Sequence, residues 1–245
     1  MELRDKLEKV KENISNTQNK NGLYNKVEII AVTKTHSFKT IQDSYKAGFL
    51  SIGENRVQEA LDKFGSFDSM PELKRRFIGH LQSNKLKKCL SLFDTIDSVD
   101  STSLLKKISN HGQKSNKKIP VLLEINTSKE SQKYGFLPEE IDEVLSCFEE
   151  PGALITGLMT VAPFTLNEKK LRSSFKSLRV LKEKVNNALE GNEIHELSMG
   201  MSNDYKIAIE EGSTMIRLGT LLFGRRGTLN SVSYTHLTLP TNREV

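Results

Sequence analysis

Lys34 is the residue of this chain whose type and position best suit it for chemistry. It ends an apolar segment, Val27–Thr33, that is rich in β-branched residues and about one strand long, which is typical of a buried strand in a parallel sheet. Burial disfavours the charged form of a lysine. An amine at such a place can therefore be neutral, and so nucleophilic, near neutral pH.

Two interpretations of Lys34 follow from its position alone. A neutral amine can form a Schiff base with a carbonyl group, and pyridoxal 5'-phosphate (PLP) is the commonest cofactor that proteins hold in this way. Alternatively, the aliphatic stem of Lys34 packs at the end of the strand while its head group reaches water. The choice depends on the groups that the rest of the chain brings next to this amine.

Apolar strand patterns and amphipathic helix patterns alternate along the chain after residue 26. The predicted strands are residues 27–33, 49–53, 76–79, 93–98, 119–126, 154–159, 194–198 and 215–218. The predicted helices that follow them are residues 39–47, 56–63, 85–90, 102–110, 138–148, 168–189, 204–211 and 220–223. Eight such units in about 200 residues predict an α/β protein with a (β/α)8 (TIM) barrel. A doubly wound sheet is the alternative, but it usually needs fewer units.

A helix pattern precedes these units. Leu3, Leu7, Val10 and Ile14 recur at spacings of four, three and four, which gives one apolar stripe on a helix, and a polar segment from residue 16 to 21 follows. We therefore predict a single barrel domain over residues 1–228 with an extra N-terminal helix. Residues 229–245, rich in Ser and Thr, have no place in the eight units, and we predict a tail outside the fold, disordered or a vector or sequencing scar.

The ends of the predicted strands carry mostly polar or reactive side chains. In a barrel, functional groups lie at the C-terminal ends of the strands and in the loops just after them. The chain places there Lys34, Asn55, His80, Ser98, Asn126, Met159, Ser198 and residues 217–220. This pattern favours a functional site at one rim of the barrel, with Lys34 as a member.

The segment Arg217-Leu218-Gly219-Thr220 is the predicted binding site for phosphate and for the cofactor ring. Gly219 and Thr220 begin the last helix, where unpaired N–H groups and the helix dipole favour an anion; the alternative is an ordinary strand-to-helix turn. An arginine has no acceptor and keeps its proton, so Arg217 beside a pyridine nitrogen would leave that nitrogen unprotonated. The alternative for Arg217 is an ion pair at the barrel mouth.

Other rim residues have two interpretations each. Ser198 or Ser202 could donate a hydroxyl to phosphate; we predict that Ser198 contacts phosphate and that Ser202 caps the helix at 204–211. Asn55 either contacts the cofactor ring or caps the helix that follows it. His80 either stacks or transfers a proton in the site, or has a structural role.

Composition excludes several other classes of protein. The chain of 245 residues is 36% hydrophobic and 27% charged, which provides enough apolar material for a core. It has no apolar run of membrane-spanning length, no signal-peptide pattern at its start and only two cysteines. The net charge of +5 is not accompanied by aromatic residues among the basic clusters, so we predict no binding to nucleic acid or membranes. We expect a cytoplasmic protein.

Six segments of the sequence match one family in order: Ala31–Thr35, Ile52–Glu59, Phe77–Lys85, Gly157–Thr160, Leu197–Ser202 and Arg217–Gly224. Over about residues 3–227, the chain resembles the pyridoxal phosphate homeostasis protein family (YggS/PROSC). The barrel of that family is similar to the N-terminal domain of alanine racemase. The family often has Ser where Thr33 stands here, and the tail is not a family feature.

The resemblance implies a role for several residues. It implies that Lys34 forms the Schiff base with PLP, that Arg217 faces the pyridine nitrogen, and that Gly219, Thr220 and Ser198 hold the phosphate. It also implies a protein that carries or buffers PLP inside the cell, without established turnover. Lys133 and Gly135 match a family loop whose role the resemblance does not give.

Two enzyme classes are the alternatives. One is a PLP-dependent amino-acid racemase, which needs an acid or base on each face of the substrate and, in alanine-racemase-like enzymes, a second domain that supplies a tyrosine. We expect no such domain here, and hence a monomer, with PLP-dependent apoenzymes as the partners that receive the cofactor. The other alternative is a Schiff-base aldolase on the same fold.

Overall fold

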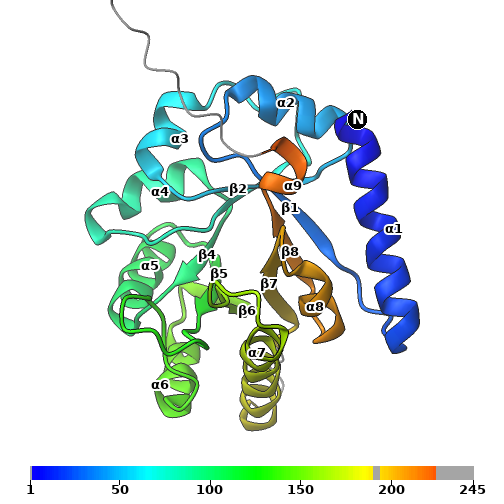
Figure 1. The fold of residues 1–245 in the computed structure, drawn as a ribbon. Coiled ribbons are helices and arrows are strands. Elements are labelled where there is room, and N and C mark those ends of the chain that lie inside the picture. Colours follow the sequence, from blue (N-terminus) through cyan, green and yellow to red (C-terminus); the bar gives the residue numbers. More distant parts are fainter. Residues whose placement is uncertain (1, 190–193, 225–245) are drawn as a thin grey trace, which may run out of the picture.

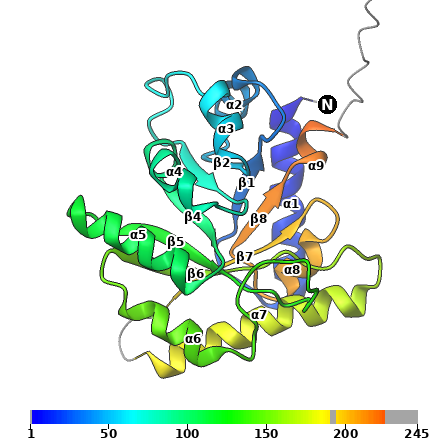
Figure 2. The ribbon, with the colours of Figure 1, turned by 90° about the vertical axis from the view of Figure 1, so that its left-hand side faces the viewer.

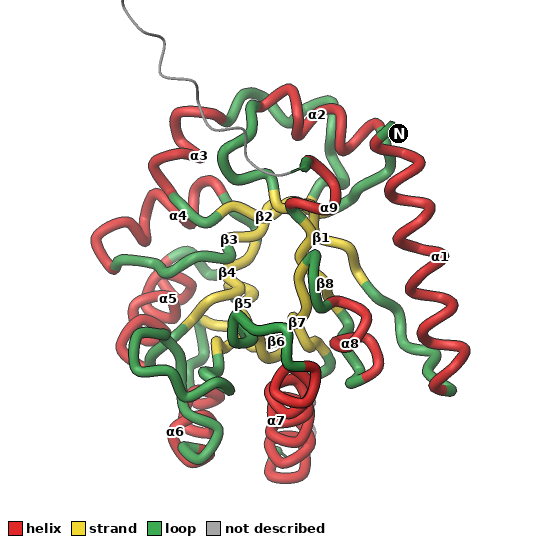
Figure 3. The backbone as a smooth tube through the Cα atoms, viewed as in Figure 1, coloured by secondary structure: helices red, strands yellow, loops and turns green. Residues whose placement is uncertain are grey.

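Eight parallel strands form a closed barrel in which each strand pairs with its neighbours in sequence (Figure 3). The computed structural model describes residues 2–189 and 194–224. Pairing of the first and last strands, with Glu28 opposite Met215 and Ala31 opposite Leu218, closes the barrel. The predicted α/β class and (β/α)8 barrel are therefore confirmed. The strands are β1 (Glu28–Val32), β2 (Ser51–Glu54), β3 (Lys74–Phe77), β4 (Thr95–Val99), β5 (Ile119–Glu124), β6 (Ala153–Met159), β7 (Glu196–Met201) and β8 (Met215–Leu218).

The helices lie around the outside of the barrel (Figures 1 and 2). They are α1 (Leu3–Asn21), α2 (Phe38–Lys46), α3 (Val57–Lys63), α4 (Leu86–Leu92), α5 (Thr102–Lys114), α6 (Ile141–Ser146), α7 (Glu168–Ala188), α8 (Tyr205–Glu210) and α9 (Thr220–Phe223), with the 3-10 turns η1 (Ser83–Lys85) and η2 (Cys147–Glu149). None of the helices within the described ranges is long and apolar enough to cross a membrane.

The extra N-terminal helix α1 packs along one side of the barrel next to α8 (Figure 1). Leu7, Val10 and Ile14 are buried on its inner face, as the apolar stripe predicts. The predicted end of the helix before residue 16 is wrong, because α1 continues through the polar segment to Asn21. It ends where Gly22 adopts a left-handed conformation (φ 62°), which glycine does without steric cost. Polar residues on the outer face do not stop a helix whose inner face is already buried.

Two other predicted boundaries differ from the structure. The helix predicted to begin at Pro138 begins at Ile141, because a turn comes first, in which the Leu137 N–H donates to the Glu140 carboxylate. The strand predicted at 194–198 is observed at Glu196–Met201 and pairs with β6 and β8. Its length is set by these partners rather than by its own apolar pattern. The predicted tail, residues 229–245, and the last residues of the predicted domain lie outside the described residues.

Apolar side chains fill the space between barrel and helices and the middle of the barrel interior. Ile30, Leu122, Met159 and Met215 meet inside the barrel. Below them, at the N-terminal ends of the strands, lies Arg76, whose side chain is only 2% exposed. Arg76 thus fills the interior at the N-terminal ends of the strands, called the floor below, and the C-terminal ends of the strands form the opposite rim, called the mouth.

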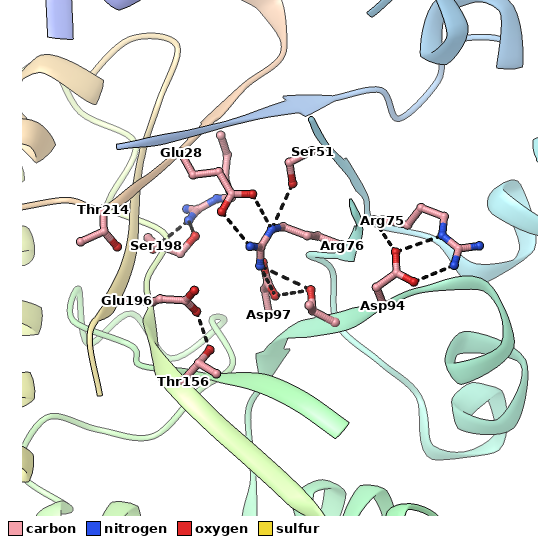
Figure 4. A network of polar contacts seen from close by, with 12 residues as sticks. Glu28, Ser51, Arg75, Arg76, Asp94, Asp97, Thr156, Glu196, Ser198 and Thr214 are labelled. Carbon is pink, nitrogen blue, oxygen red and sulfur yellow. Dashed lines mark hydrogen bonds and ion pairs between the residues drawn. The ribbon is translucent and has the colours of Figure 1, made fainter. Parts of the chain in front are cut away.

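The floor of the barrel is a polar network around Arg76 (Figure 4). The Arg76 guanidinium pairs with Glu28 (Nη2–Oε2 2.9 Å) and Asp97 (Nη1–Oδ2 3.1 Å) and donates from Nε to the Ser51 hydroxyl. Burial alone would lower the pKa of Arg76, but Asp97 and Glu28 hold it above its usual value. Arg76 therefore stays charged and neutralises the carboxylates around it.

Candidate functional site

Lys34 lies in the turn that follows β1, at the mouth of the barrel. Side chains alternate between the two faces of a strand, and Ile30 belongs to the barrel interior, so Lys34 is in register with the inward-facing positions. Its side chain is partly buried. Two residues further on, the His36 ring lies 4.9 Å from the ring of Phe223 in α9. The turn that carries Lys34 therefore contacts the helix that follows β8.

Arg217 on β8 is held rigidly inside the same mouth. Its Nη1 donates to the carbonyl oxygen (2.8 Å) and the hydroxyl (2.7 Å) of Ser198, and its Nη2 donates to the carbonyl oxygen of Thr160 (2.7 Å). Burial lowers the pKa of Arg217, while the carboxylates of Glu124, Asp204 and Asp97 oppose that effect. These bonds fix the plane of the guanidinium. Within residues 2–189 and 194–224 no carboxylate forms an ion pair with Arg217, so this part of the chain does not provide the alternative of an ion pair at the mouth.

Ser198 on β7 is fully buried beneath Arg217. Its hydroxyl oxygen accepts from the guanidinium, which leaves the hydroxyl proton available for another acceptor. The predicted contact between Ser198 and a phosphate stays a prediction.

The prediction that Ser202 caps the helix that follows it is wrong. Asp204 is the residue before the first turn of α8, and its carboxylate accepts from the Met201 N–H at 2.5 Å. The Ser202 hydroxyl instead accepts from the N–H groups of Gly219 (3.3 Å) and Leu221 (3.1 Å). Ser202, in the loop after β7, therefore binds the start of α9, which follows β8. The predicted phosphate-binding segment, residues 217–220, lies at the same place.

Gly219 occupies a position where the fold does not require glycine. Its φ angle is negative (−117°), and a Cβ atom there would make only ordinary contacts, 3.6 Å from Val32. Gly79 offers a contrast, because a Cβ at that residue would lie 2.3 Å from the carbonyl oxygen of Asn55. The absence of a side chain at Gly219, between Arg217 and Thr220, leaves room for a group that approaches the backbone at the mouth.

Asn55 lies at the bend between β2 and α3 and is partly buried. The residue before the first turn of α3 is Arg56, and that end of the helix has no side-chain cap. The alternative role of Asn55 as a helix cap is thus wrong, while its predicted contact with a cofactor ring stays a prediction. The close packing of Gly79 on its backbone holds it in place.

His80, after β3, faces the loop that follows β5. Its Nδ1 lies 2.7 Å from the Asp100 carboxylate, and its ring stacks on that of Tyr134, with 3.8 Å between centroids and 13° between planes. Glu124 ends β5, and burial raises its pKa to about 7, reinforced by the charge of Asp100 and opposed by Arg217 and Lys133. These groups form the part of the mouth at the ends of β3, β4 and β5.

Lys133 has a structural role that its place in the sequence did not reveal. Its Nζ binds the Glu130 carboxylate (3.2 Å) and the carbonyl oxygens of Ala162 (3.2 Å) and Val161 (3.3 Å). It therefore connects the loop after β5 to the loop after β6. The only sequence signal was its match to a family loop.

Comparison with known proteins identifies the family. The family model described as alanine racemase, N-terminal domain, matches residues 6–227. A pyridoxal phosphate homeostasis protein of Aquifex aeolicus is 37% identical over 203 residues, which cover 82% of this chain and 88% of that protein. This chain belongs to the pyridoxal phosphate homeostasis protein family. The resemblance predicted from the six sequence segments is confirmed.

Solved structures agree with this membership. PipY of Synechococcus elongatus, a structure with PLP bound, is 32% identical and superposes with a TM-score of 0.80, covering 91% of this chain and all (100%) of that one. An alanine racemase of Clostridium difficile shares the fold, with a TM-score of 0.71 at 18% identity; this chain covers 60% of its length. This chain thus has the barrel fold of that enzyme and matches only part of its length.

Proposed function

We propose that this protein binds PLP at the mouth of its barrel and acts in intracellular PLP homeostasis, as a carrier or buffer of the cofactor. Membership of the pyridoxal phosphate homeostasis family and the PLP-bound PipY structure support the cofactor. The observation that carries the proposal for this chain is the arrangement of the mouth. It combines a lysine after β1, in register with the inward-facing positions, with a rigidly held arginine on β8 and a glycine that packing does not require.

The residues at the mouth suit the chemical groups of PLP. When bound, PLP supplies an aldehyde that an amine can join and an aromatic ring that can withdraw electrons. Lys34 would provide the amine, which adds to the aldehyde carbon with release of one water. Thr220, Ser198 and the segment at Gly219 would hold the phosphate. Ser202 joins this set because its hydroxyl oxygen accepts from the N–H groups of Gly219 and Leu221, which leaves the hydroxyl proton to donate to the phosphate. Asn55 would contact the ring.

Arg217 favours a carrier over a catalyst. Its guanidinium can only donate hydrogen bonds, so a pyridine nitrogen facing it stays unprotonated. An unprotonated ring withdraws electrons less strongly, which disfavours loss of a proton from a bound amino acid. Three hydrogen bonds to Ser198 and Thr160 keep this guanidinium in one orientation. We therefore propose binding without robust turnover.

The proposal includes a setting for this function. We place the protein in the cytoplasm, as a monomer that delivers PLP to PLP-dependent apoenzymes. The two cysteines, Cys89 and Cys147, are buried free thiols, which suits a reducing compartment.

The test is the visible absorption spectrum of the purified protein mixed with PLP. We expect a band that is lost in Lys34→Ala and kept in Lys39→Ala, whose lysine lies in an exposed ion pair with Asp43 on α2. Absence of the band in the wild type would overturn the cofactor assignment and favour the aldolase. D- and L-amino acids added to the same sample distinguish a carrier from a racemase, because only a racemase interconverts them.

A further inference from the structure

A buried cluster of charges lies behind the barrel wall at Lys34. Lys63 of α3 is paired with Glu54 of β2 (Nζ–Oε1 2.7 Å) and with Glu59 of α3 (3.0 Å), and its side chain is only 8% exposed. Its Nζ also donates to the carbonyl oxygen of Thr33 (3.0 Å). An ammonium group has three protons, and these three acceptors match that number. The geometry of Lys63 is therefore fully specified.

The cluster holds the residues on both sides of Lys34. On one side, the Thr33 hydroxyl donates to the Glu54 carboxylate at 2.5 Å. On the other side, the N–H of Thr35 donates to the Glu59 carboxylate. Thr33 and Thr35 are thus attached to the same ammonium group through two carboxylates, and Lys34 lies between them.

Thr35 needs this attachment because its backbone is strained. Its φ angle is +67°, in the left-handed region, which a β-branched residue rarely adopts. A strained backbone conformation of this kind persists only where surrounding contacts hold it. The hydrogen bond from the Thr35 N–H to the Glu59 carboxylate is such a contact. The left-handed residue turns the chain directly after Lys34, so the direction of the Lys34 side chain depends on it.

A contribution to stability does not by itself explain this buried cluster of charges. Glu54 is fully buried, and one of its carboxylate oxygens, Oε2, has no hydrogen-bond partner among the described residues. Burial raises the pKa of Glu54, although Lys63 and Thr33 oppose this. A buried ion pair is often no more stabilising than apolar residues of similar size. Positioning of a neighbouring group gives a reason for these charges.

We propose that Lys63 is a positioning residue for Lys34: with Glu54 and Glu59, it fixes the turn from Thr33 to Thr35 and so pre-organises the amine at the barrel mouth. The inference rests on the proposed function, since it concerns the amine that would join PLP. Placement errors near 1 Å cost up to about a hundredfold in the rate of a reaction between positioned groups, so even a modest loosening is measurable.

The first test compares Lys63→Met with Lys39→Met. Both remove a lysine that pairs with a carboxylate four residues away on its helix, but the Lys39 pair is exposed and makes no bond to the cluster that holds Thr33 and Thr35. In the apoprotein, we expect faster hydrogen exchange of the amide of Thr35 in Lys63→Met only. With PLP added, we expect the Lys34-dependent absorption band to form about tenfold more slowly in Lys63→Met and at the wild-type rate in Lys39→Met.

A second pair of variants covers the case in which Lys63→Met does not fold. Glu59→Ala removes the acceptor of the Thr35 N–H, whereas Glu59→Gln keeps an amide oxygen there; Glu59 is 24% exposed, so neither creates a large cavity. We expect slow band formation and fast exchange in Glu59→Ala, with recovery in Glu59→Gln. Wild-type rates and exchange in both Lys63→Met and Glu59→Ala would overturn the proposal. If the wild type shows no band, the proposed function fails, while the exchange of the apoprotein still decides the positioning role.

Discussion

Arg217 and Ser198 are joined by two hydrogen bonds from the same nitrogen: Nη1 donates to the Ser198 carbonyl oxygen at 2.8 Å and to its hydroxyl at 2.7 Å. The two residues lie on adjacent strands, β8 and β7, and both are buried. A guanidinium bound in this way cannot rotate to a second orientation. Ser198 therefore holds the Arg217 guanidinium in place, in addition to any contact that it makes with phosphate.

Ser198→Ala is expected to weaken the hold on Arg217. The carbonyl bond remains, but the guanidinium loses one acceptor in a buried place, which costs about 1.5–3 kcal/mol in the free energy of unfolding. Chemical denaturation of the apoprotein measures this loss. Ser91→Ala is the control, because the Ser91 hydroxyl makes its bond at an exposed position; it should change stability by less than about 0.5 kcal/mol. Equal effects of the two substitutions would contradict the supporting role of Ser198.

Two adjacent arginines on β3 should differ sharply in their contribution to stability (Figure 4). Arg76→Met leaves the buried carboxylate of Asp97 without its partner, so we expect a loss of about 3–5 kcal/mol in the free energy of unfolding. Arg75 pairs with Asp94 at the surface, and Arg75→Met should cost about 1 kcal/mol or less. Denaturant titration of both variants checks the difference. A loss below 1 kcal/mol in Arg76→Met would show that the floor network does not stabilise the barrel.

Glu124 should make the stability of the apoprotein fall as pH rises. Burial raises the pKa of Glu124 to about 7 in the folded protein, above its ordinary value of 4.5. The folded state therefore binds a proton more tightly than the unfolded state, and this stabilisation is complete below the unfolded pKa and lost as pH rises through about 7. We expect the free energy of unfolding of the wild type, relative to Glu124→Gln, to decrease by about 2 kcal/mol between about pH 5 and 8. A difference that does not change with pH would contradict the raised pKa.

Gly219→Ala and Gly79→Ala should separate binding from folding. A methyl group fits at Gly219, so we expect a change in stability below about 1 kcal/mol, together with weaker binding of PLP because the methyl group occupies the approach to the backbone. Gly79→Ala should instead lose about 2 kcal/mol or more, since its Cβ would collide with the Asn55 carbonyl. Thermal denaturation and PLP titration measure the two effects. Pyridoxal without its phosphate is the control ligand, and its binding should be unaffected by Gly219→Ala; unchanged PLP affinity would place the phosphate elsewhere.

The sequence by itself determined the architecture and the position of the principal reactive group. Apolar segments and amphipathic segments alternate along the chain, and this local periodicity was sufficient to predict eight βα units and a barrel. Because a barrel collects the ends of its strands at one rim, the same pattern placed Lys34 and Arg217 at a common mouth.

Tertiary structure decided the contacts between one βα loop and another. Ser202 was assigned to its own helix by local capping rules, but closure of the barrel brings its hydroxyl to the N–H groups at the start of α9 instead. Lys63 appeared in the sequence as one of many charged residues on a helix, and only packing of α3 on the sheet buries it between Glu54 and Glu59. Periodicity encodes which face of an element is buried, whereas partners distant in sequence are chosen by the register and closure of the whole sheet.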